Sequence, residues 1–86
     1  MQPSIENLAG LVTPGMVIVD IGAHIGYFTR IFSKLVGEKG FVIAFEADEE
    51  NFKILQKNTA HLGNVKIFPL AVSEKSGVID FYHCEE

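Results

Sequence analysis

Apolar runs and segments of helical periodicity alternate along most of the chain. The run at residues 16–19 is rich in β-branched side chains and fits a strand that is buried on both faces. Further runs at residues 41–45 and 65–70 are predicted as the second and third strands. The first two runs are each followed by a segment whose apolar residues recur at helical spacing.

These two segments are predicted as helices. The first follows Gly26, has Lys34 in its last turn and stops at Gly37. The second is capped by Asp48, carries acidic residues in its first turn and continues to Gly63.

Two shorter elements flank this alternation. Ser4 can cap a short helix over residues 5–11. Residues 73–77 have the composition of a turn, and residues 78–82 are predicted to return as a short antiparallel strand.

Strands that alternate with helices predict right-handed crossovers and an α/β fold, with helices flanking a Rossmann-like parallel sheet. The chain supplies β-α-β-α-β plus a hairpin strand, which is the N-terminal half of a doubly wound fold. Its 86 residues exclude two domains. We therefore expect a single partial domain over residues 1–86, as a fragment of a longer protein.

Composition and charge narrow the function classes. The chain is 48% hydrophobic, and its 7 Lys and Arg against 11 Asp and Glu give a net charge of −4. A chain of negative net charge has no positive electrostatic field to attract phosphates, so nucleic-acid binding is not expected. A single cysteine excludes an internal disulfide and a structural zinc site, and no apolar run approaches the roughly 20 residues that span a bilayer. The expected setting is cytoplasmic, without a membrane partner.

The turn after the first strand is the first candidate site. It has the sequence D-I-G-A-H-I-G, from Asp20 through Gly22, Ala23 and His24 to Gly26, at the sheet edge where open α/β folds bind ligands. Glycines there let a ligand approach the main chain, and the first N–H groups of the following helix point into the same space. The alternative is a tight turn without a ligand, because close packing of helix and strand also requires glycine.

Glu46 strengthens the ligand interpretation. It ends the second strand, 20 residues after Gly26, where an acidic side chain accepts the ribose hydroxyls of an adenine nucleoside. Taken alone, Glu46 would be interpreted as a solvated residue that leads into the second helix, and the ligand interpretation depends on its combination with the glycine turn. A carboxylate at this position would also repel the 2′-phosphate of NADP.

The spacing of the glycines distinguishes between nucleosides. A dinucleotide site requires G-x-G-x-x-G, whereas this chain has D-x-G-x-x-x-G. Asp20 suits an α-amino group and would oppose a pyrophosphate. S-adenosylmethionine carries such an ammonium group, so the pattern favours it over NAD.

Three segments together resemble the start of a class I S-adenosylmethionine-dependent methyltransferase, and within that class the FkbM-like group. They are V-D-I-G-A-H-I-G-Y-F-T, F-E-A-D-E-E-N-F-K-I-L-Q-K-N and L-A-V-S-E-K-S-G, which cover nearly the whole chain from Pro14 to Tyr82. The resemblance implies that residues 20–26 form the cofactor loop, that Glu46 binds ribose and that Ala71 lies near the adenine. It also implies O-methyl transfer in the complete protein, to an acceptor that the sequence does not name.

Two positions depart from that group. His24 stands where its members usually have Asn or Gly, and Ala47 stands where they usually have Pro. Histidine is among the residues enriched at positive φ, so we expect His24 to serve the same turn and to add a donor near the cofactor. A catalytic role for His24 is the alternative.

The other reactive side chains show no pattern that suggests a catalytic or metal-binding role. His61 and His83 lack the spacing of a metal site, and His61 fits a helix end. Cys84 has no neighbouring base, so a nucleophilic role is not expected. The aromatic residues are expected in the core, with Tyr27 at the mouth of the loop as an exception.

An incomplete sheet has further consequences. The strand at residues 16–19 is expected to have an unpaired edge, which favours self-association with a second copy. The chain alone is expected to be catalytically weak or inactive. Two other interpretations stay open: an oxidoreductase fragment that binds a dinucleotide, and a non-catalytic module that recruits a partner through its sheet edge.

Overall fold

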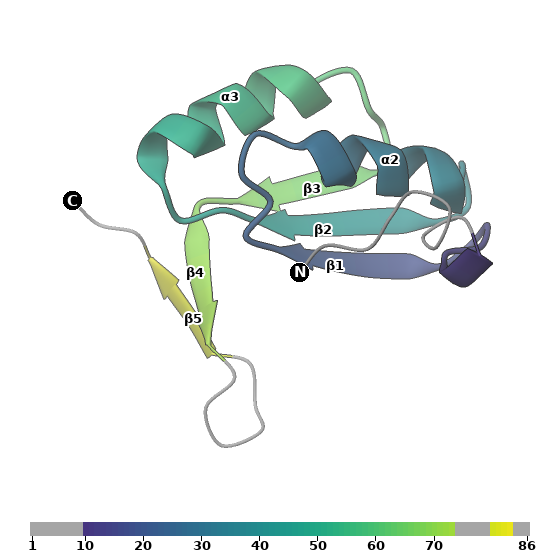
Figure 1. The fold of residues 1–86 in the computed structure, drawn as a ribbon, viewed down its shortest axis with the longest axis horizontal. Helices are drawn as coiled ribbons and strands as arrows, with labels where there is room; N and C mark the ends of the chain where they lie inside the picture. Colours follow the sequence, from purple (N-terminus) through teal and green to yellow (C-terminus); the bar gives the residue numbers. More distant parts are fainter. Residues whose placement is uncertain (1–9, 74–79, 84–86) are drawn as a thin grey trace.

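The computed structural model describes residues 10–73 and 80–83, which form two helices and two small sheets (Figure 1). The elements follow one another as β1 (Val17–Ile21), α2 (Tyr27–Val36), β2 (Phe41–Phe45), α3 (Glu49–Thr59), β3 (Val65–Phe68), β4 (Leu70–Ser73) and β5 (Asp80–His83). This is the predicted α/β alternation, with a hairpin at its end.

The first three strands form a parallel sheet in the order β1-β2-β3. Val17 to Ile21 of β1 lie opposite Phe41 to Phe45 of β2, and Val42 of β2 lies opposite Val65 of β3. The carboxyl ends of β1 and β2 therefore meet at one edge. The predicted Rossmann-like half-sheet is confirmed.

Both helices lie on the same face of this sheet (Figure 1). Right-handed crossovers that advance strand by strand in one direction place every connecting helix on one side. On the opposite face of β1, the side chains of Val17, Val19 and Ile21 are 63%, 49% and 44% exposed. The prediction that the first strand is buried on both faces is wrong for the described residues, because no described helix covers the second face.

The core lies between the helices and the covered face of the sheet. One cluster of buried residues joins Val12, Val36 and Val42, and a second joins Ala23, Ala44 and Leu55. The second cluster lies beneath the turn after β1, so packing fixes the backbone at the edge where β1 and β2 end.

The helix ends follow local signals. Asp48 caps α3 as predicted, because its carboxylate accepts a hydrogen bond of 2.9 Å from the N–H of Asn51. Gly37 ends α2 with φ 71°, and Lys34 lies in the last turn. The second helix ends at Thr59, before the predicted stop at Gly63, and a turn follows it.

The predicted third strand is divided into two. β3 ends at Phe68 and β4 begins at Leu70, because Pro69 has no N–H group to donate to a sheet ladder. β4 leaves the parallel sheet and pairs antiparallel with β5, with Ser73 opposite Asp80. The expected hairpin is confirmed at residues 80–83, while the predicted turn beyond Ser73, the start of its returning strand and Cys84 lie outside the described residues.

Of the predicted helix at residues 5–11, only residues 10 and 11 are described, and both are helical. No helix in the described ranges has the length and apolar character needed to cross a membrane.

Candidate functional site

The turn between β1 and α2 has a backbone that few side chains tolerate. Gly22, His24 and Gly26 have φ values of 72°, 57° and 98°, all in the left-handed region. The expected positive φ of His24 is confirmed, since it is the one non-glycine residue in that region among the described residues. The alternation of these three positions winds the chain sharply from strand into helix.

Hydrogen bonds connect this turn to β2 and α3. The N–H groups of Gly22 and Ala23 both donate to the carbonyl of Phe45, each at 2.9 Å. The side-chain amide of Asn58 donates to the carbonyl of Ile25 at 2.6 Å. The turn is therefore held before any ligand arrives, which lowers the conformational cost of binding.

The two glycines serve different purposes. A Cβ on Gly26 would lie 2.8 Å from Cδ1 of the fully buried Leu55, so Gly26 allows α3 to pack closely. A Cβ on Gly22 would meet no atom within 4 Å, so Gly22 borders open space. The packing alternative therefore explains Gly26, whereas Gly22 leaves its backbone accessible to a ligand.

Glu46 joins the turn from the end of β2. Its side chain is 6% exposed, and its Oε1 accepts a 2.6 Å hydrogen bond from the N–H of His24. Its Oε2 accepts a second bond of 3.0 Å from the N–H of Asp48. Each oxygen keeps acceptor capacity for a further donor such as a hydroxyl group. The alternative of a solvated residue is wrong, because Glu46 is buried against the glycine turn.

Asp20 is oriented by a residue that the sequence analysis missed. The hydroxyl of Thr29 donates to Oδ2 of Asp20 at 2.6 Å, and Thr29 is fully buried in the first turns of α2. Burial raises the pKa of Asp20, and the Thr29 hydrogen bond opposes part of that rise. Thr29 shares the buried face of α2 with Ser33 and Val36, so a polar residue on an inward helical position was the available signal.

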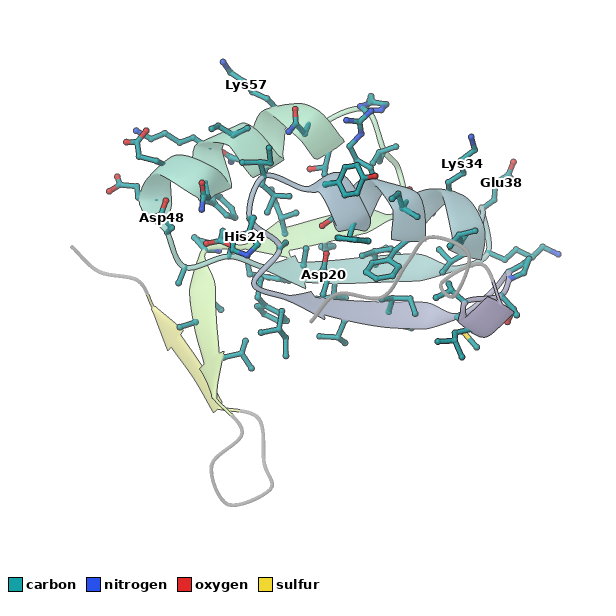
Figure 2. The ribbon with its side chains drawn as sticks, in the orientation of Figure 1. Asp20, His24, Lys34, Glu38, Asp48 and Lys57 are labelled. Carbon is teal, nitrogen blue, oxygen red and sulfur yellow. The ribbon has the colours of Figure 1, made fainter. Side chains whose placement is uncertain are left out.

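A hollow of about 120 Å³ lies over the turn. It is lined by Asp20, Gly22, Ala23, His24, Ile25, Tyr27 and Phe28. Asp20 and His24 are labelled in Figure 2, and both line this hollow. Ligand pockets commonly measure about 300–1,000 Å³, so this hollow accommodates part of a nucleoside-sized ligand.

The predicted adenine-side residue lies apart from this group. Ala71 is on β4, opposite Tyr82 of β5, and not at the end of β3 as expected. The structure thus brings together six of the predicted residues, namely Asp20, Gly22, Ala23, His24, Gly26 and Glu46. Among the side chains that the structure describes, at residues 10–72, no three His, Cys, Asp or Glu are grouped so that they could hold a metal ion.

The site fits S-adenosylmethionine by its donors and acceptors. Asp20 presents a carboxylate suited to an ammonium group, and Gly22 leaves its backbone open in the same hollow. Glu46, bonded to the N–H of His24, presents acceptors suited to ribose hydroxyls. None of these groups favours a pyrophosphate.

Sequence comparisons agree with this chemistry. Residues 1–80 match the family model of protein-L-isoaspartate(D-aspartate) O-methyltransferase. The chain is 32% identical over 84 residues to protein-L-isoaspartate O-methyltransferase of Thermotoga maritima, which covers 93% of the chain and 26% of that protein. It is 56% identical over 40 residues to ribosomal RNA large subunit methyltransferase E of Acinetobacter baumannii, covering 46% of the chain and 18% of that protein.

A structural comparison gives the same result. The fold is similar to a SAM-dependent methyltransferase from Aquifex aeolicus, with a TM-score of 0.68 and 29% identity over 76% of the chain and 37% of that protein. The chain thus spans about a quarter of one matched sequence relative and about a fifth of the other. Its fold, its glycine turn and its match over residues 1–80 place it in the protein-L-isoaspartate(D-aspartate) O-methyltransferase family of the class I S-adenosylmethionine-dependent methyltransferases.

Proposed function

We propose that residues 1–86 form the cofactor-binding half of an S-adenosylmethionine-dependent O-methyltransferase domain. The observation that supports this most directly is the contact of Glu46 with the N–H of His24. It brings the acid predicted to bind ribose against the glycine turn, 22 residues earlier in the chain. The same edge holds Asp20, whose carboxylate suits the amino-acid part of the cofactor.

Four residues have separate roles in this proposal. Asp20 attracts the ammonium group, and Glu46 accepts hydrogen bonds from the ribose hydroxyls while it keeps its bonds to the backbone. Gly22 lets the cofactor touch the main chain. His24 maintains the turn by its positive φ. When bound, S-adenosylmethionine supplies an electrophilic methyl group on its sulfonium.

The acceptor is proposed from the relatives. Their names indicate isoaspartyl residues of proteins in one case and ribosomal RNA in the other. The expectation against nucleic-acid binding, which rested on net charge, therefore loses its support. Transfer to oxygen and the finer resemblance to the FkbM-like group stay predictions, as does the place of Ala71 near the adenine.

We also propose that the chain self-associates through β1. This strand pairs only with β2 among the described residues and exposes apolar side chains on its open face. Light scattering that finds only a monomer of 9.5 kDa would contradict this proposal.

Binding of S-adenosylhomocysteine, followed by amide NMR and calorimetry, tests the cofactor site. The decisive variant is Gly22→Val, which fills the open space at the turn. Gly15→Val is the matched control, since Gly15 also has a positive φ of 91° and open space around it but lies outside the site. We expect binding that shifts the signals of Gly22, Gly26 and Glu46, that disappears in Gly22→Val and that persists in Gly15→Val.

Two other results would replace the proposal. Preferential binding of NAD would favour the oxidoreductase fragment, although the turn lacks G-x-G-x-x-G. A folded chain that binds neither compound, and whose association with a partner does not change in Gly22→Val, would favour the interaction module.

A further inference from the structure

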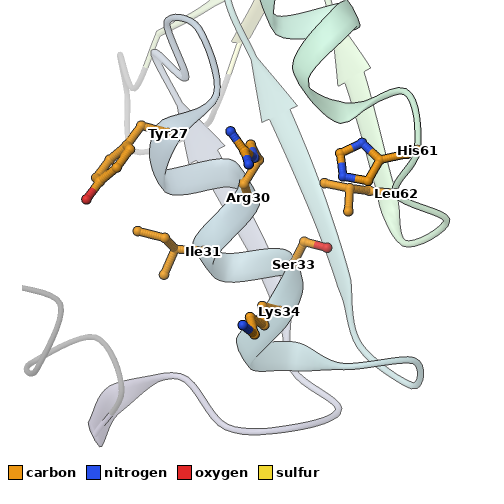
Figure 3. A pocket seen from close by; sticks show the side chains of 7 residues that line it. All are labelled: Tyr27, Arg30, Ile31, Ser33, Lys34, His61 and Leu62. Carbon is orange, nitrogen blue, oxygen red and sulfur yellow. The ribbon is translucent and has the colours of Figure 1, made fainter.

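A second and larger hollow lies over α2, with Tyr27 and Ile31 at one side and the turn after α3 at the other (Figure 3). Its volume is about 480 Å³. We call it the α2 groove, and it is lined by Tyr27, Arg30, Ile31, Ser33, Lys34, His61 and Leu62 (Figure 3). The residues from α2 are spaced as i, i+3, i+4, i+6 and i+7, so most of them share one face of the helix.

The α2 groove concentrates positive charge in an acidic chain. Arg30 and Lys34 are one helical turn apart and exposed, and His61 reaches the groove from the opposite side (Figure 3). No carboxylate lines the groove. Among residues 10–72, whose side chains the structure describes, the one ion pair joins Lys53 to Glu50 at 3.9 Å, so no ion pair within that range neutralises the groove cations.

The carboxylates nearest in sequence lie at the ends of this surface. Glu38 follows Lys34 by four residues, beyond the end of α2, and the acidic group at residues 48–50 lies at the start of α3. His61 lies at the other end of α3. The net charge of −4 therefore does not describe the α2 groove, whose charged lining residues are cationic.

The two sides of the α2 groove are fixed to each other by Asn64. Its side-chain amide donates to the carbonyls of Ser33 and Gly37, both at 2.9 Å, and its Oδ1 accepts from the hydroxyl of Ser33 at 2.5 Å. The N–H of Leu62 donates to the carbonyl of Thr59 at 2.9 Å. These bonds hold the turn after α3 against α2, so the shape of the groove does not depend on a ligand.

We infer that the α2 groove binds the sugar-phosphate backbone of single-stranded RNA, presented as the methyl acceptor. This inference rests on the proposed function, which leaves RNA and an isoaspartyl protein as acceptors. Cations spaced along the groove suit a repeating anion, and Tyr27 with Ile31 and Leu62 offers surfaces on which bases can stack or pack.

Continuity with the glycine turn favours a polymer. Tyr27 lines both the α2 groove and the hollow over the turn, so a strand in the groove runs toward the cofactor site. An isoaspartyl side chain presents a single carboxylate and would use only one of the cations. RNA engages several of them at once.

Fluorescence anisotropy with a labelled RNA of about 12 nucleotides tests the inference at several salt concentrations. The groove variant is Arg30→Gln/Lys34→Gln. Its matched control is Lys57→Gln/Lys66→Gln, which removes the same charge at exposed residues outside the groove. We expect the groove variant to bind RNA about tenfold more weakly, and the slope of log K against log salt to fall by about 1.4, at roughly 0.7 for each lost phosphate contact.

The control should keep nearly all of the RNA affinity and of the salt slope. Equal losses of RNA affinity in both double variants would show that RNA binding depends only on the overall charge of the chain, and would overturn the inference. Failure of the unmodified chain to bind RNA at low salt would do the same. If a glutamate-rich peptide binds as tightly as RNA, and the groove variant no longer binds it, the α2 groove is a site for acidic peptides and not for RNA.

Binding of S-adenosylhomocysteine by the same proteins separates this inference from the proposed function. None of the four substituted residues lines the glycine turn, so both double variants should bind it as the unmodified chain does. Nucleoside binding without RNA binding overturns the groove alone. RNA binding that depends on the groove, without nucleoside binding, overturns the cofactor site alone.

Discussion

Replacing Thr29 by valine tests whether the orientation of Asp20 depends on a single hydrogen bond. Thr29 is fully buried, and its hydroxyl lies 2.6 Å from Oδ2 of Asp20. Valine keeps the volume and β-branched shape of threonine but cannot donate. The variant therefore leaves a partly buried carboxylate without this partner and leaves the surrounding packing in place.

The expected loss of stability follows from the charge of the acceptor. A hydrogen bond to a charged group contributes about 1.5–3 kcal/mol. In a domain of this size about 1 kcal/mol corresponds to about 4–8 °C, so Tm should fall by about 6 °C or more. The bond favours the ionised form of Asp20, so the loss should be largest near neutral pH and should shrink in acid, where the carboxyl group is protonated.

Cofactor binding should also weaken in Thr29→Val. A released Asp20 side chain must be ordered again on binding, at about 0.5–1.5 kcal/mol, which is about 2- to 12-fold in affinity for S-adenosylhomocysteine. Thermal unfolding between acid and neutral pH, together with calorimetric titration of the nucleoside, measures both effects.

Thr29→Ser is the matched control, since it keeps the hydroxyl and removes one methyl group. Lost packing alone should cost it about 0.5–1.5 kcal/mol. It should retain the pH dependence and the affinity of the unmodified chain. Serine that is as destabilising as valine, or valine that leaves nucleoside affinity unchanged, would refute the assignment of Thr29 as the residue that positions Asp20.

Three further predictions concern the glycine turn and the α2 groove. Because burial raises the pKa of Asp20, its protonated form stabilises the folded state in acid, and this contribution is lost as pH rises through the folded pKa. Asn cannot ionise, so the free energy of unfolding of Asp20→Asn, measured with urea, should exceed that of the unmodified chain by a margin that grows from acid to neutral pH. Gly26→Ala should destabilise by about 1–3 kcal/mol in thermal unfolding, from its φ of 98° and the contact with Leu55, and should exceed Gly22→Ala, which meets open space; equal losses would contradict the packing role. Asn64→Ala removes three hydrogen bonds and should raise hydrogen exchange after α3, while unchanged protection there would contradict the bracing of the α2 groove.

Most of the fold could be predicted from the sequence because its signals are local. β-branched runs and helical stripes depend on residues within a few positions of one another, and they give the order of strands and helices. The Asp48 cap and the positive φ of His24 are equally local. The break at Pro69 was also local and was missed, because the apolar character of residues 65–70 outweighed the missing N–H group.

The sequence could predict which residues form the candidate site, but not the hydrogen bonds between them. Spacing along the chain identified Asp20, Gly22 and Glu46, because carboxyl ends of neighbouring parallel strands meet at one edge. It did not reveal that Glu46 bonds to the N–H of His24, or that Thr29 holds Asp20. Both bonds depend on how closely the turn and the strand ends approach.

The sequence by itself determined which elements form and which residues gather at the edge of the sheet, since those follow from periodicity and from parallel strand order. Only the tertiary structure decided which face of β1 stays exposed, because that depends on the side that both helices cover. It also decided that Arg30, Lys34 and His61 share one groove in an acidic chain. Net charge sums over the chain, whereas a groove depends on where folding brings each charge.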